Sequence, residues 1–187
     1  MTATKVTSGL ITSVAGVAGS GGWEFVSSVT ASTSSTVAFT NMTTGYDWLY
    51  IFEHIALATD GAHMRAKLGI SGPTYRTSSY KSKIHGIIGS TSGGTEVTTY
   101  ISAGGYSTQG NADGEQLVGE LTLIDPVRAG HTNYYHTSMH EDGDGVHQWG
   151  AGGGFYDADE AHPAIQFYVS SGTISSGTFW QYRRANA

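Results

Sequence analysis

The sequence predicts an all-β protein, and three features lead to this expectation. Only 13% of its 187 residues are Asp, Glu, Lys or Arg, and stretches rich in Ala, Leu, Glu and Lys, which favour helices, are scarce. Tyr, Phe and Trp stand among many Thr and Val, the residue types that suit a pleated surface. Short runs of these residues are separated by Gly, Ser, Asn and Asp. A chain of this length can bury the core of one domain.

The first 22 residues differ from the rest of the chain. They end in a glycine-rich run, residues 19–22, directly before Trp23. We therefore expect an extended N-terminal arm over residues 1–22, joined to a β-sandwich domain over residues 23–187. One interpretation of the arm is a disordered terminus, and the other is a segment that orders against a neighbouring subunit. In the second, the apolar contacts come from Leu10, Ile11, Val14 and Val17.

From Trp23 onward, runs of strand-forming residues recur at the short spacing that is typical of a sandwich or a barrel. In the run 116–125, Leu121 and Leu123 alternate with Glu120 and Thr122, so one face is expected in the core and the other in solvent. The expected strands are 23–30, 35–41, 47–58, 63–70, 80–89, 95–102, 116–125, 131–140, 146–156, 164–170 and 177–183.

Two of these runs carry additional information. Both faces of the run from Trp48 to Leu57 are largely apolar, which predicts a strand at the centre of its sheet or one whose outer face meets another subunit. Glu53 and His54 interrupt it, and we expect both to be hydrogen-bonded near an edge or interface. The closing runs, 165–169 and 177–182, are joined by Gly and Ser and are expected to fold back on each other as a strand pair.

Charge and cysteine content exclude several classes of partner and site. The formal net charge is −6, and the nine Lys and Arg residues are scattered, so we expect neither nucleic acid nor an anionic membrane as partner. No stretch has the roughly 20 apolar residues of a membrane-spanning helix. The chain has no cysteine, which excludes disulfides, thiolate nucleophiles and Cys-ligated zinc.

Four histidines within a short span suggest a metal site at first sight: His131, His136, His140 and His147. On a strand, His136 and His140 share a face but lie about 13 Å apart. Zinc ligands lie about 2 Å from the metal, so these two cannot share one ion without a partner from another strand. The neighbouring acidic run, residues 141–145, contains two Asp-Gly pairs, which predict a hairpin turn instead of a calcium loop.

No motif assembles a catalytic group. The sequence lacks a Gly-x-Ser-x-Gly nucleophile elbow, and the glycine run 150–154 lacks the spacing of a phosphate-binding loop. A glycine run between two aromatic residues predicts a bulge or a close approach of another backbone segment. We therefore expect a protein that is not an enzyme and that uses no metal and no cofactor.

Two parts of the chain resemble bacteriophage structural proteins, notably those from phages of aquatic bacteria. The residues that carry the resemblance are Phe39-Thr40, Gly45-Tyr46-Asp47, Tyr50, Thr59-Asp60-Gly61, Met64-Arg65, Leu68, Gly72, Tyr75-Arg76, Ile165, Phe167, the run 171–179 and Tyr182. The chain departs from the family at Trp180, where an aliphatic residue is usual, and at Arg183, which replaces a final Gly. The resemblance covers about residues 23–183 and supplies no catalytic residues.

The resemblance implies a jelly-roll-like antiparallel β-sandwich on the virion exterior, often trimeric, in tail fibres or head decoration. We expect a homotrimer that decorates the capsid as a cement protein, with a major capsid protein or a tail component as its partner. A fibre normally needs shaft repeats, and no internal repeat is present. The aromatic residues expected at an interface, with the sandwich core as the alternative, are Trp48, Tyr50, Trp180 and Tyr182.

A tail-fibre, receptor-binding or carbohydrate-binding module is the alternative function. Sugars stack on exposed aromatic faces that are flanked by Asp, Asn and Gln, and a host-surface glycan is then the partner. The aromatic residues expected in or near loops, where such contact occurs, are Tyr134, Tyr135, Trp149 and Tyr156.

Overall fold

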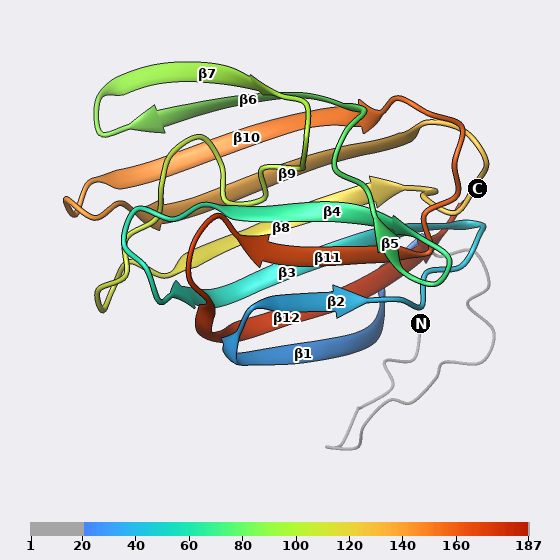
Figure 1. The fold of residues 1–187 in the computed structure, drawn as a ribbon, viewed down its shortest axis with the longest axis horizontal. Coiled ribbons are helices and arrows are strands. Elements are labelled where there is room, and N and C mark those ends of the chain that lie inside the picture. The colour runs from blue at the N-terminus through green and yellow to red at the C-terminus, as the bar shows by residue number, and fades with distance from the viewer. Residues whose placement is uncertain (1–20, 187) are drawn as a thin grey trace, which may run out of the picture.

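The computed structural model describes residues 21–186, in which two antiparallel sheets pack as a sandwich (Figure 1). The eight-stranded sheet has the order β1-β12-β3-β8-β9-β10-β6-β7, and the four-stranded sheet has the order β2-β11-β4-β5. This confirms the predicted all-β sandwich, while the jelly-roll-like strand order stays a prediction. The strands are β1 (Glu24–Ser34), β2 (Thr36–Phe39), β3 (Tyr46–Leu57), β4 (Met64–Ile70), β5 (Thr74–Tyr75), β6 (Tyr80–Ile88), β7 (Thr91–Val97), β8 (Leu117–Ile124), β9 (Thr132–Glu141), β10 (His147–Tyr156), β11 (Ala164–Val169) and β12 (Ile174–Ala185).

Each range expected to be a strand overlaps an observed one, but two details differ. The range 95–102 was expected as a strand, whereas β7 covers Thr91–Val97, because Gly93 and Gly94 resemble a turn in sequence yet lie within the strand. The two-residue strand β5 is too short to leave a sequence pattern. The predicted hairpin turn at 141–145 is confirmed, since Asp142 accepts hydrogen bonds from the amides of Asp144 and Val146 between β9 and β10.

The expected pairing of the closing strands is wrong. β11 pairs with β2 and β4 in the small sheet, whereas β12 pairs with β1 and β3 in the large sheet. The Gly-Ser connection therefore crosses from one sheet to the other. Phe167 of β11 and Phe179 of β12 face each other across the core instead, with ring centroids 5.2 Å apart.

Trp48 and Tyr50 belong to the sandwich core, which corrects their expected place at an interface. They are 1% and 0% exposed, on a strand that is central in its sheet, as predicted. The Tyr50 ring packs 5.3 Å from Phe39 and 5.4 Å from Phe167, and its hydroxyl accepts a hydrogen bond from the buried amide of Gln181. Of the two roles that the sequence left open for these residues, the structure supports the one in the core.

Tyr134 and Tyr156 are likewise buried, at 3% each, although they were expected in loops for contact with a ligand. Both lie within strands of the large sheet, and their side chains point into the sandwich. The Tyr156 ring lies 5.2 Å from that of Tyr80 and 4.7 Å from the imidazole of His162. The arm candidates Leu10, Ile11, Val14 and Val17 lie outside the described residues.

The small sheet covers only part of the large one, and the loop 98–116 covers much of the rest (Figure 1). Tyr106 of this loop lies over glycines of three adjacent strands. A Cβ atom added to Gly86 would lie 2.5 Å from the Tyr106 Cβ, and one added to Gly150 would lie 3.0 Å from the Tyr106 nitrogen. The predicted close backbone approach at residues 150–154 is therefore confirmed at Gly150.

Replacing Gly86 by alanine tests the close packing of Tyr106 on the sheet. The new Cβ would also lie 2.9 Å from the carbonyl oxygen of Trp149, and neither neighbour can swing away. We expect Gly86→Ala to lower the free energy of unfolding by about 1–3 kcal/mol in urea denaturation. Gly93→Ala is the matched control, because its Cβ meets only the outer end of the Tyr106 ring, which can rotate. If Gly86→Ala and Gly93→Ala lowered the free energy of unfolding equally, this would contradict a loop 98–116 that is fixed in place over the sheet.

Candidate protein-binding surface

The outer face of the eight-stranded sheet carries all the large hydrophobic side chains that the described part of the chain leaves exposed. Their exposed fractions lie between 42% and 54%, far above those of core residues. They come from β1, β6, β9 and β10. These residues are Phe25, Ile87, Tyr135, Met139 and Trp149.

Strand register places several of these side chains in one unbroken row. Ile87 on β6 pairs with Trp149 on β10, Trp149 pairs with Met139 on β9, and Met139 pairs with Val118 on β8. Directly paired residues on adjacent strands have Cβ atoms about 5 Å apart on the same face. The four side chains therefore form a continuous apolar row across four strands.

A second apolar group lies at the other side of the same face. The Phe25 ring lies 6.0 Å from that of Trp180 and 5.7 Å from that of Tyr182, both of which are half-buried. Trp180 pairs with Ile51 on β3, and its indole nitrogen donates a 2.7 Å hydrogen bond to a carboxylate oxygen of Glu53. This bond fixes the indole on the sheet surface and leaves the ring face available for contact.

The two groups meet at a shallow hollow, which the Glu53 carboxylate that accepts the Trp180 hydrogen bond also lines. Its other lining residues are Ile51, Phe52, Val118, Trp180 and Tyr182. Together the two groups cross seven adjacent strands, from β1 to β6, and we refer to them as the apolar stripe. Contiguous exposed apolar surface of this kind marks a site of interaction with another protein or a ligand. The apolar stripe consists of Phe25, Tyr182, Trp180, Ile51, Val118, Met139, Trp149 and Ile87.

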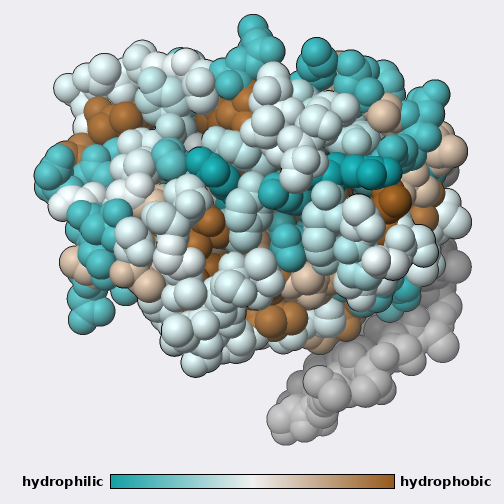
Figure 2. All heavy atoms as spheres, in the orientation of Figure 1, coloured by the Kyte–Doolittle hydropathy of each residue, from teal (hydrophilic) through white to brown (hydrophobic). Residues whose placement is uncertain are grey.

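The face that bears the small sheet differs in character. Figure 2 shows that side of the molecule, on which hydrophilic and neutral residues dominate and hydrophobic spots are small and separate. Here long side chains cover the aromatic rings. Lys67 lies 4.5 Å from the centre of the Tyr168 ring, and Arg65 lies 4.2 Å from that of Tyr100. The apolar stripe is therefore a property of one face only.

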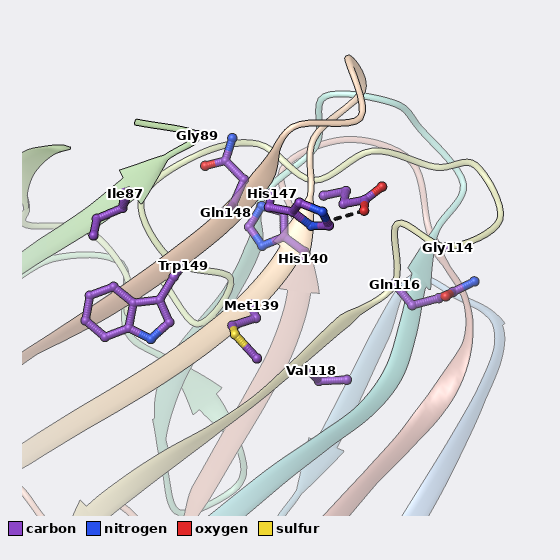
Figure 3. Close-up of a pocket in the computed structure, with 11 residues that line it drawn as sticks. Ile87, Gly89, Gly114, Gln116, Val118, Met139, His140, His147, Gln148 and Trp149 are labelled. Atoms are coloured by element: carbon purple, nitrogen blue, oxygen red, sulfur yellow. Dashed lines mark ion pairs between the residues drawn. The ribbon is translucent and has the colours of Figure 1, made fainter. Parts of the chain in front are cut away.

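One end of the stripe borders a groove of about 500 Å³, large enough for a small ligand or a protruding side chain (Figure 3). Trp149, Met139 and Val118 form its apolar wall, and Gln116 lies opposite Trp149. His147 reaches over the groove, where its Nδ1 lies 3.1 Å from a carboxylate oxygen of Glu141.

Two polar residues of the groove serve the fold. The Gln148 amide donates a 2.7 Å hydrogen bond to the Asp142 carboxylate, and the hydrogen bonds that reach this carboxylate lower the pKa of Asp142. The His140 Nε2 lies 3.1 Å from the carbonyl oxygen of Thr108 in the covering loop. Burial lowers the pKa of His140. Gln116 and the Glu141–His147 pair are thus the polar groups left for a ligand.

The four histidines between residues 131 and 147 lie in different surroundings. His131 stacks on Phe155, with ring centroids 5.2 Å apart, and His147 is exposed, whereas His136 and His140 are buried on the inner face of β9. Within residues 21–186, no three His, Cys, Asp or Glu side chains are grouped so that they could hold a metal ion. That range also contains no helix long and apolar enough to cross a membrane.

The sequence matches no protein-family model and no curated protein. The geometry of the chain therefore carries the argument about function.

Sequence reasoning found part of this surface. Trp180 and Tyr182, which the sequence places at an interface, lie on the outer face. Tyr135 and Trp149 are exposed on the same face, but they lie within β9 and β10 and not, as the sequence suggested, in loops. Sequence reasoning missed Phe25, Ile51, Ile87, Val118 and Met139, which were read as ordinary strand residues. In the sequence these residues stand beside other apolar or small residues, which indicates that both faces of their strands are apolar. The register between strands is needed to show that they align on one face.

A buried histidine on the inner face of β9 should make the free energy of unfolding depend on pH. His136 is 1% exposed, and neither ring nitrogen has a hydrogen-bond partner among the described residues. Burial lowers the pKa of His136 from 6.5 to about 4. The unfolded chain therefore takes up this proton at a higher pH than the folded chain. Stability is complete above about pH 6.5 and falls as the pH drops toward 4, by roughly 3 kcal/mol at most from this residue.

We expect His136→Leu to remove this part of the acid response. In urea denaturation at pH 7.5 and pH 4.5, the variant should lose less free energy of unfolding on acidification than the wild type. His147→Leu is the matched control, because the side chain of His147 is exposed. An unchanged response in His136→Leu would show that this imidazole is not held neutral by burial.

Proposed function

We propose that this chain is a non-enzymatic structural protein of a bacteriophage virion exterior, where it decorates and stabilises the capsid. The apolar stripe is the observation that carries the proposal, because it crosses seven strands on one face of a rigid sandwich. The resemblance of residues 23–183 to phage structural proteins supports the virion as its location. A jelly-roll-like strand order and a homotrimer belong to the same proposal.

The chemistry of the stripe favours a protein partner over a sugar. Ile87, Met139 and Val118 offer aliphatic and thioether surface, which contacts apolar side chains and provides no hydrogen bonds to hydroxyl groups. Burying each half-exposed side chain contributes roughly 1 kcal/mol to the free energy of docking. Several such contacts per copy, repeated over many copies, stabilise an assembled shell that the protein binds more tightly than free subunits. The partner is then the major capsid protein or a tail component.

A charge in the stripe should weaken this docking. Met139 is 54% exposed, so Met139→Glu should fold normally, but docking would bury an unpaired carboxylate. We expect binding to capsids that lack the protein to weaken at least tenfold in co-sedimentation. The control is Gln166→Glu, which adds the same charge on the outer side of β11 in the small sheet. Equal binding of Met139→Glu and the wild type would contradict docking through the stripe.

The position of the chain on virions tests the proposal as a whole. Antibody labelling in electron micrographs should mark the shell lattice. Label confined to the tail would favour a tail fibre, and particles without the protein would contradict any virion role.

A glycan-binding module is the second candidate, and the groove is the observation that favours it. The exposed Trp149 indole stands opposite Gln116 and near the Glu141–His147 pair, which is the combination of an aromatic platform and polar groups that sugars use. If this is the function, a glycan array should show defined sugars bound by the wild type and not by Trp149→Ala. Loss of capsid binding in Met139→Glu without any glycan signal would support decoration.

A further inference from the structure

The shallow hollow in the middle of the apolar stripe has an acidic rim. Its volume is about 330 Å³, within the range of sites that bind small ligands or single side chains. Glu53 lines the hollow, and Glu120 on β8 pairs directly with Ile51, another lining residue. Directly paired residues have Cβ atoms about 5 Å apart on the same face, so the Glu120 side chain borders the hollow. Two carboxylates therefore stand among the apolar side chains of the stripe.

Neither carboxylate has a cationic partner among the described residues. Within residues 21–186, the ion pairs of lysine, arginine and histidine side chains do not include Glu53 or Glu120. The two arginines near the end of β12 are paired elsewhere, Arg183 with Glu24 and Arg184 with Asp47. A protein that covers the hollow removes water from its acidic rim, and burying an unpaired carboxylate is strongly unfavourable. Such a partner must therefore bring a positive charge to this place.

The surroundings of Glu53 suit a guanidinium group better than an ammonium group. The Oε2 atom of Glu53 accepts the 2.7 Å hydrogen bond from the Trp180 indole, which leaves the second carboxylate oxygen to accept from a partner. The same bond holds the indole beside the carboxylate on the wall of the hollow. A planar guanidinium stacks on an indole face while its N–H groups donate to a neighbouring carboxylate, whereas an ammonium is a compact and strongly hydrated point charge.

We propose that the hollow is an arginine-binding site, which receives one arginine side chain of the protein on which the stripe docks. The guanidinium stacks on the Trp180 indole and donates hydrogen bonds to Glu53, and the aliphatic part of the side chain packs against Ile51 and Val118. Glu120 adds a second negative charge. This inference rests on the proposed function in so far as the stripe is the docking surface. The arginine then fixes the position of the partner on the face.

Arginine can be tested as a ligand of the full-length protein without any capsid. The four tryptophans are labelled with ¹⁵N, and the indole signal of Trp180 is assigned by its absence from the spectrum of Trp180→Phe. Titration with N-acetyl-arginine amide should shift this signal in a saturable manner. N-acetyl-citrulline amide, which has a similar shape and no charge, should shift it at most one-fifth as far at the same concentration. The signal of Trp48, which lies in the core, should not move.

A matched pair of variants tests the role of Glu53. Glu53→Gln retains an oxygen that accepts the hydrogen bond of the Trp180 indole, so the variant loses the charge with little change in shape. We expect it to bind N-acetyl-arginine amide at least fivefold more weakly than the wild type. Glu96→Gln is the control, because Glu96 is exposed on β7, five strands away from β3 in the same sheet. This variant loses the same charge and should bind as the wild type does.

Each result of the titrations decides the inference. A saturable shift that requires the charge of arginine and that Glu53→Gln weakens supports it. Equal shifts with the arginine and citrulline compounds, the absence of a saturable shift, or equal affinity in Glu53→Gln and Glu96→Gln would overturn it.

Co-sedimentation with capsids that lack the protein separates this inference from the proposed function. If an arginine of the partner enters the hollow, Glu53→Gln should bind these capsids at least fivefold more weakly than Glu96→Gln. Normal binding of the wild type with equal binding of the two variants would overturn the inference and leave the proposed function standing. Failure of the wild type to bind would count against the proposed function, and the titrations would still decide whether the hollow binds arginine.

Discussion

Two sheets of unequal width share one hydrophobic core, and most other features of the molecule follow from this mismatch. The four-stranded sheet packs aromatic residues against β3 and β12, where Phe167 meets Phe52 and Phe179. Beyond β8 the large sheet continues for four more strands. The loop 98–116 has to cover their inner face, and it can approach closely because glycines replace side chains beneath Tyr106.

The sequence was sufficient for the positions of the strands and insufficient for their partners. Alternation of apolar and polar residues located β8 and β11, and Asp-Gly pairs located the turn before β10. Pairing depends on contacts between residues far apart in sequence, which is why β11 and β12 were wrongly joined although they belong to different sheets. Burial was equally hard to predict: Trp48 and Trp180 look alike in sequence, yet only Trp180 faces outward.

The proposed surface becomes visible only when the aromatic content of the sequence and the register of the strands are considered together. Sequence identified an excess of aromatic residues, some of which fill the core and some of which remain outside. Register then aligned Ile87, Trp149, Met139 and Val118 into one row that no single segment displays. The same face includes the edge strand β1, on which Phe25 is exposed.

β7 is the strand at the second edge of the large sheet, where the sheet could grow by addition of a further strand. Its outer edge has unpaired backbone groups, and such an edge is a template on which another chain can add a strand. Gly93 and Gly94 occupy the middle of β7, and Glu96 adds a charge near its end. Glycine is a poor strand former, and like charges repel, so sideways growth of the sheet into a continuous ribbon is disfavoured.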